Sequence, residues 1–113
     1  MKKFVYLLKE FNSKNSYKIG VSKNKPNRIS QLQTGNKNKI ELVDFYETDF
    51  YSLVETTLHN MYSHKKVNPE DFTDVLKGEW FYLDEKDVID FVDKCKKIEK
   101  NIKFLKDNKS FFL

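Results

Sequence analysis

The sequence predicts an α+β fold on the strength of three observations. Two short apolar and aromatic runs, 4–8 and 17–22, flank the polar cluster 12–16, which is the pattern of a β-hairpin. A further run at 40–46 is mostly apolar and also favours a strand. The C-terminal part carries apolar residues at steps of three and four, the spacing of a helix buried along one side. A length of 113 residues is enough for one domain with its own core.

Between the second and third strands, the sequence predicts a helix that begins at Pro26 and ends before Gly35. Proline is favoured in the first helical turn because its missing N–H has no helical partner there, and glycine favours the end of a helix. Ile29 and Leu32 supply the apolar side of this helix.

A second helix is predicted from about residue 50 to residue 63, with Asp49 as its N-cap. A buried stripe is expected from the 4-then-3 spacing of Val54, Leu58 and Met61. The neighbouring stripe consists of Glu55, His59 and Tyr62.

The last part of the chain is predicted to run from a polar loop, 65–78, through a short aromatic strand or extended segment, 79–83, into a long helix capped by Asp84. The helix has an apolar seam made of Val88, Phe91, Cys95, Ile98, Ile102 and Leu105. We expect the seam to pack on the rest of the domain; a homodimer through this helix or the apolar tail 111–113 is the alternative. The chain then divides into a core, 1–83, and a C-terminal helix and tail, 84–113, within a single domain.

Charge is unevenly distributed along the chain. Residues 1–40 hold ten basic groups and one acid, 41–93 hold four basic groups and fourteen acids, and 94–113 hold seven basic groups and two acids. A basic N-terminal part favours a polyanionic partner, although a lysine-rich composition can serve solubility alone.

The single cysteine excludes an internal disulfide and fits a reducing compartment. The apolar run after Met1 is five residues long, too short for a signal peptide or a membrane span. The expectation is a cytoplasmic protein, or a nuclear one in a eukaryotic host, with no membrane partner.

Arg28 is the only arginine among 21 basic residues. An arginine guanidinium can bind phosphate through two parallel hydrogen bonds, which an ammonium cannot do. Arg28 would also lie in the first turn of the predicted helix, and a helix N-terminus attracts anions. A single surface charge is the plainer interpretation. The candidate nucleic-acid-binding residues around it are Lys18, Lys23, Lys25, Lys37 and Lys39.

Tyr6 and Tyr17 face each other across the hairpin if its turn centres near residues 11–12. A phenol needs a nearby cation to act as a base at neutral pH, and either tyrosine can equally be a core residue. Glu55 offers one carboxylate, which with water and substrate phosphate is a common way to hold Mg²⁺. His59, one turn on, either contacts phosphate or supports the site, or else borders the core.

These residues, in this order, resemble the GIY-YIG nuclease superfamily, and in particular a phage and large-virus subgroup whose second motif is spaced Tyr-x-Ile-Gly. The matching pieces are Phe4-Val5-Tyr6, Tyr17-Lys18-Ile19-Gly20, the Pro-x-Arg start at Arg28, Gln33-Thr34-Gly35-Asn36, Glu55 with Leu58-His59, and Glu79-Trp80-Phe81. In the first motif, Phe4 stands where the family has glycine, and Val5 stands where it has isoleucine.

The resemblance implies a small three-stranded, mostly antiparallel sheet flanked by helices. It also implies metal-dependent hydrolysis of DNA phosphodiester bonds with one Mg²⁺ or Mn²⁺ ion. By that likeness Tyr6 is the base for the attacking water with Tyr17 beside it, Arg28 stabilises the pentacovalent phosphate, Glu55 ligates the metal, and His59 is a subgroup feature of unassigned role.

Two other hypotheses stay open. The first is a catalytically weak or inactive nucleic-acid-binding module on the same fold; the presence of Tyr6, Tyr17, Arg28 and Glu55 together favours the enzyme. The second is a protein-interaction domain that uses the helical seam and the tail. Salt-sensitive DNA binding separates this last hypothesis from the other two.

Overall fold

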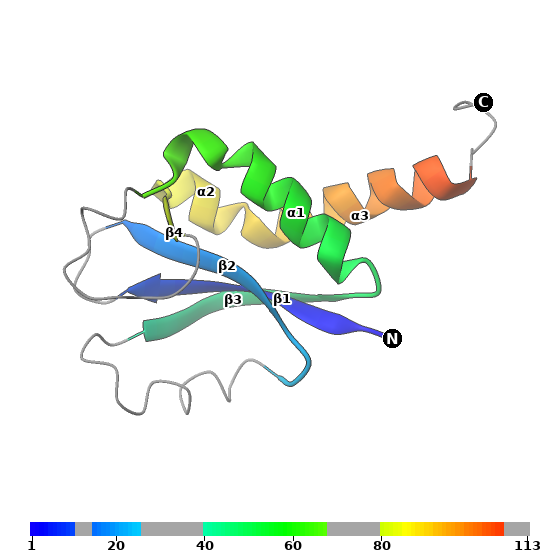
Figure 1. The fold of residues 1–113 in the computed structure, drawn as a ribbon, viewed down its shortest axis with the longest axis horizontal. Coiled ribbons are helices and arrows are strands. Elements are labelled where there is room, and N and C mark those ends of the chain that lie inside the picture. Colours follow the sequence, from blue (N-terminus) through cyan, green and yellow to red (C-terminus); the bar gives the residue numbers. More distant parts are fainter. Residues whose placement is uncertain (11–14, 26–39, 68–79, 108–113) are drawn as a thin grey trace.

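The fold was analysed in a computed structural model, which describes residues 1–10, 15–25, 40–67 and 80–107. Its sheet contains β1 (Lys3–Glu10), β2 (Ser16–Ser22), β3 (Ile40–Thr48) and β4 (Trp80–Tyr82). The strand order is β3-β1-β2-β4, and each neighbouring pair is antiparallel (Figure 1). The predicted α+β class is confirmed.

The three strands predicted from the sequence are present, each one to three residues longer than its apolar run. The short aromatic strand predicted as one alternative for 79–83 is also present, as β4, so the sheet has one strand more than the three that the resemblance implies. β4 pairs residues 80–82 with residues 16–18 of β2. Three residues are too few to show an alternating pattern, so its place in the sheet follows from its pairing partner.

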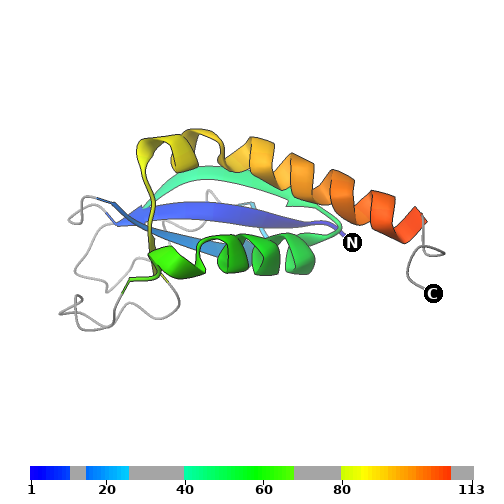
Figure 2. The ribbon, with the colours of Figure 1, turned by 90° about the horizontal axis from the view of Figure 1, so that it is seen from above.

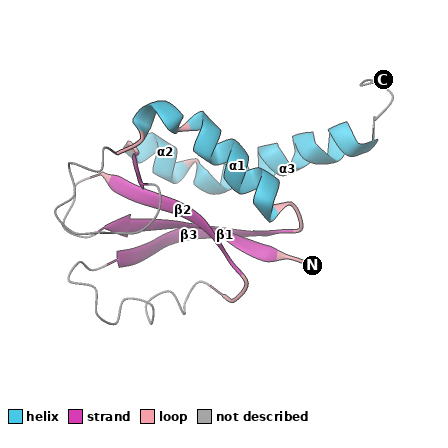
Figure 3. Ribbon diagram, viewed as in Figure 1, coloured by secondary structure: helices cyan, strands magenta, loops and turns pink. Residues whose placement is uncertain are grey.

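The helices are α1 (Tyr51–Met61), a short 3₁₀ turn η2 (Ser63–Lys65), α2 (Glu85–Ile89) and α3 (Phe91–Asp107). They gather on one side of the sheet, with α1 along β2 and α3 along β3 (Figures 2 and 3). The C-terminal part of α3 extends past the end of the strands.

The core lies between these helices and the facing side of the sheet. Because side chains alternate along a strand, Val5 and Leu7 of β1 share that side with Ile19 of β2. They are fully buried against Val54 and Leu58 of α1, two of the three residues of the predicted stripe. We refer to this side of the sheet as the helix face and to the other, on which no described helix packs although Phe4 and Leu8 are buried there, as the open face.

The two ends of α1 differ from the prediction. Asp49 is not the N-cap: Phe50 holds that position without a side-chain cap, and its N–H donates to Thr48 Oγ1 at 3.0 Å. At the other end Met61 is 41% exposed, whereas Tyr62 is only 4% exposed. The helix stops at Met61, and the non-helical backbone of Tyr62 directs its ring into the core.

The predicted long final helix is two helices separated by Asp90. Asp84 does cap the first, since its Oδ1 accepts from the Asp87 N–H at 2.9 Å in a capping box. Along the seam, Phe91, Cys95 and Ile98 are buried in the core. Leu105 is exposed, since α3 has by then passed the end of the sheet.

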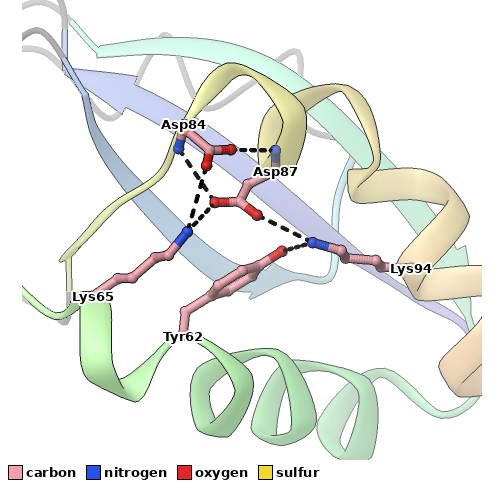
Figure 4. A network of polar contacts seen from close by, with 5 residues as sticks. All are labelled: Tyr62, Lys65, Asp84, Asp87 and Lys94. Carbon is pink, nitrogen blue, oxygen red and sulfur yellow. Dashed lines mark hydrogen bonds and ion pairs between the residues drawn. The ribbon is translucent and has the colours of Figure 1, made fainter.

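A polar network joins the end of α1, η2, α2 and α3 (Figure 4). Asp87 Oδ2 lies 2.6 Å from Lys65 Nζ, and Oδ1 lies 3.3 Å from Lys94 Nζ. Lys94 also donates to Tyr62 Oη at 2.8 Å. Although burial alone raises the pKa of Asp87, the bonds from Lys65, the Asp84 backbone and Lys94 lower it to about 2. The network therefore stabilises the packing of the C-terminal helices on α1.

β3 lies at one end of the strand order and is interrupted by an irregularity opposite Leu7 and Leu8, where the pairing register shifts by one residue. The Phe45 N–H donates to Asp44 Oδ1 at 2.9 Å. One backbone donor of this strand is therefore satisfied by a neighbouring carboxylate.

The predicted helix at 26–35, most of the loop 65–78 and the tail 111–113 fall outside the described residues. The division into a core, 1–83, and a C-terminal part, 84–113, stays a prediction, although α3 does pack on the core. In the portions that the structure describes, no helix combines the length and apolarity needed to cross a membrane.

Candidate functional site

The open face of the β1–β2 hairpin holds the phenol of Tyr6 against the backbone of Gly20. The two residues are directly opposite in the antiparallel register. A β-carbon added to Gly20 would lie less than 3.0 Å from Tyr6 Oη and Cζ. Glycine is thus required here for space, because any side chain would displace the phenol.

Lys18 shares this face, since it lies two residues before Gly20 on β2 and opposite Leu8 on β1. It is therefore the diagonal cross-strand neighbour of Tyr6, within reach of a long side chain. Lys18 is half-buried, and this burial lowers the pKa of its ammonium.

The expectation that Tyr6 and Tyr17 face each other is wrong. Tyr17 is opposite Lys9, three residues before Gly20, and so lies on the helix face, where it is 7% exposed within the core. The register places the hairpin's centre nearer residue 13 than residues 11–12, and that difference decides which side chains meet. A catalytic role for Tyr17 stays a prediction.

Glu55 acts electrostatically on both groups of the open face. Burial raises the pKa of Tyr6, and the negative charge of Glu55 raises it further. The same charge opposes the lowering of the Lys18 pKa by burial. A phenol, an ammonium and a carboxylate thus form one interacting group, which we call the Tyr6–Lys18–Glu55 cluster.

His59 fixes α1 against the edge of β2. β4 covers β2 only as far as Lys18, and the next carbonyl, that of Ile19, lies 2.8 Å from His59 Nε2. A carbonyl can only accept, so Nε2 carries a proton and donates. The ring also packs edge-on against Phe81 at a centroid distance of 5.2 Å. His59 therefore sets the position of Glu55, one turn earlier on the helix.

The cluster offers one carboxylate suited to a divalent cation. Glu55 supplies the hard oxygen ligand that Mg²⁺ and Mn²⁺ take, and water and phosphate can complete the shell. Within the described ranges, no three His, Cys, Asp or Glu side chains group in a way that could hold a metal.

The structure describes only some of the remaining predicted residues. Lys23 and Lys25 follow β2 and are exposed. Arg28, Lys37 and Lys39 lie outside the described residues. Lys18 stays a predicted nucleic-acid-binding residue, and its position two residues before Gly20 is the signal that it shares the face of Tyr6.

Fold and cluster together define a small α+β domain with ionisable groups gathered on one β-hairpin and held there by a helix. The profile of the T5orf172 domain matches residues 3–103, almost the whole chain. The chain belongs to the T5orf172 domain family. No curated protein and no solved structure matches it.

Proposed function

We propose that this T5orf172 domain is a DNA endonuclease of the GIY-YIG type that hydrolyses phosphodiester bonds with one Mg²⁺ or Mn²⁺ ion. The observation that carries the proposal is the approach of the Tyr6 phenol to Gly20 under the electrostatic influence of Glu55. The occurrence of T5orf172 domains in phage-type and homing-endonuclease-like proteins supports it.

In this proposal the water oxygen forms a bond to phosphorus, the opposite P–O ester bond breaks, the water proton passes to Tyr6 Oη, and the departing alkoxide takes a proton from solvent. Tyr6 must therefore act as a phenolate, yet burial and Glu55 both raise its pKa. Glu55 would hold the divalent ion, which would offset the carboxylate charge and polarise the phosphate. Arg28, assigned from its motif, stabilises the charge that develops on the phosphate oxygens.

The roles of the other residues follow from their positions. His59 is a positioning residue, because its Nε2 is bonded to the Ile19 carbonyl rather than to substrate. Lys23 and Lys25, exposed at the end of β2, contact the DNA backbone.

The test is nicking of supercoiled plasmid in Mg²⁺, Mn²⁺ or EDTA by wild type, Tyr6→Phe and Glu55→Gln. Both substitutions are expected to reduce metal-dependent nicking by at least about 100-fold. Glu47→Gln is the matched control, since Glu47 is exposed on β3. This control is expected to cut like wild type.

Arg28→Lys adds a separate check on the guanidinium. It is expected to bind DNA nearly as well as wild type but to cleave orders of magnitude more slowly, since the two parallel bonds are lost. If no variant and no metal gives nicking but the protein shifts DNA in a salt-sensitive manner, the binding-module alternative replaces the enzyme.

A further inference from the structure

Lys18 has a position that phosphate binding alone does not explain. An ammonium that contacts the DNA backbone can stay exposed, as those of Lys23 and Lys25 are. Lys18 is instead half-buried on the open face and diagonal to Tyr6. The next residue, Ile19, accepts the hydrogen bond of His59, which lies one turn after Glu55 on α1, so Glu55 and Lys18 lie beside the same part of β2. Removing a charge from water is costly unless a partner compensates, and the Glu55 carboxylate is such a partner.

The position of Lys18 affects any divalent cation that binds to Glu55. A divalent ion at the carboxylate meets the positive charge of Lys18, and in a partly desolvated site this repulsion is screened less than at the surface. A DNA phosphate that enters the cluster brings a negative charge to Lys18 and an oxygen ligand to the ion. The repulsion in the free protein is thereby offset in the complex.

We propose that Lys18 weakens divalent-ion binding at Glu55 in the free protein, so that the metal ion and the DNA phosphate bind cooperatively. The inference rests on the proposed function, because it takes Glu55 as the metal ligand. Since coupling between two ligands is reciprocal, metal raises DNA affinity by the same factor by which DNA raises metal affinity. Lys18 is a positioning residue in this scheme.

The experiment measures binding rather than cleavage. The Kd of Mn²⁺ is measured for the free protein by electron paramagnetic resonance. The Kd of a short DNA duplex is measured in EDTA and in Ca²⁺, which takes the same hard oxygen ligands. The ratio of the two DNA Kd values reports the coupling. The variants are Lys18→Gln, Lys18→Arg, Glu55→Gln and, as the matched control, Lys23→Gln on the same strand's exposed extension.

Lys18→Gln is expected to bind Mn²⁺ about fivefold or more tighter than wild type as free protein and to show a coupling ratio smaller by a similar factor. Lys18→Arg keeps the charge and is expected to behave like wild type. Lys23→Gln is expected to weaken DNA binding equally in Ca²⁺ and EDTA, leaving the ratio unchanged.

If Lys18→Gln binds Mn²⁺ no tighter while Glu55→Gln loses it, the inference is overturned and the metal site stands. If wild type and Glu55→Gln bind Mn²⁺ alike both with and without DNA, the proposed metal ligand is itself wrong, and the inference falls with it. Thermal unfolding of each variant confirms that the compared proteins are folded.

Discussion

The close approach of Tyr6 to Gly20 allows a test in which stability and activity respond differently. In Gly20→Ala the new β-carbon overlaps Tyr6 Oη and Cζ. These atoms are the far end of a half-exposed side chain, so the ring can rotate away while the backbone of β1 and β2 stays in place. The overlap is thus relieved by moving the Tyr6 phenol.

The expected changes in stability and in nicking follow from this movement of the Tyr6 ring. Forcing a side chain off its preferred rotamer costs about 0.5–1.5 kcal/mol, and alanine in place of glycine returns about 0.4–1 kcal/mol by restricting the unfolded chain. The free energy of unfolding of Gly20→Ala is therefore expected to change by about 1 kcal/mol or less. Displacing a reacting group by about 1 Å reduces the rate about 100-fold, so nicking is expected to fall far more than stability.

Urea unfolding and plasmid nicking are measured on Gly20→Ala and also in a Tyr6→Val background. With the phenol removed, the added methyl group meets no ring, and Gly20→Ala is expected to be neutral or stabilising by about 0.5 kcal/mol. Equal destabilisation in both backgrounds would show that the methyl group collides with something other than Tyr6, and unchanged nicking by Gly20→Ala would refute the placement of the phenol.

Three further predictions concern the packing around the site. Asp87→Asn is expected to lower the free energy of unfolding by about 2 kcal/mol at pH 7, because the folded pKa of Asp87 is about 2, below its usual 3.8. This contribution to stability is present above about pH 4 and is lost as the pH falls through 2. His59→Phe keeps a ring beside Phe81 but leaves the Ile19 carbonyl without its donor, and is expected to cost about 1–3 kcal/mol in urea unfolding. Burial raises the pKa of the Cys95 thiol to about 12, so a disulfide reagent is expected to label native protein at least about 100-fold more slowly than unfolded protein.

Each of these predictions has its own control. Asp93→Asn removes an exposed acid from the first turn of α3 and is expected to leave stability within about 0.5 kcal/mol, so an equal loss would point to net charge rather than to the network. His59→Gln retains a side-chain donor and is expected to recover part of the loss; no recovery would mean that the hydrogen bond is not the cause. Rapid labelling of native Cys95 would contradict its burial.

The sequence predicts those parts of the fold that show a repeating pattern. β1, β2 and β3 each carry an apolar run, and Val54 and Leu58 stand at helical spacing, so their burial could be predicted. The aromatic run at 79–83 indicated a short strand or extended segment but not its pairing with β2, and Tyr62 enters the core only because α1 ends one residue earlier. These two features depend on tertiary contacts that periodicity does not encode.

The sequence named candidate residues for the site, but it did not predict which of their side chains share one face of the sheet. Tyr6 and Glu55 were both named from the sequence, and the negative charge of Glu55 adds to the effect of burial in raising the pKa of Tyr6. Which β2 residue joins them depends on hairpin register, and a shift of one residue exchanges the two faces of a strand. Gly20 therefore occupies the place opposite Tyr6 that was expected for Tyr17, and Lys18 lies diagonal to Tyr6, because the pairing register centres the hairpin near residue 13.

The acidic outer strand constrains how the domain meets other molecules. β3 carries Glu41, Asp44 and Glu47 and no basic residue, and the shift in its register interrupts the regular edge. Like charges oppose the antiparallel pairing of two such strands, and the Asp44 carboxylate already occupies the Phe45 N–H. Crowded copies of this protein are thus discouraged from joining edge to edge into larger sheets, and a DNA backbone is repelled from this flank of the domain.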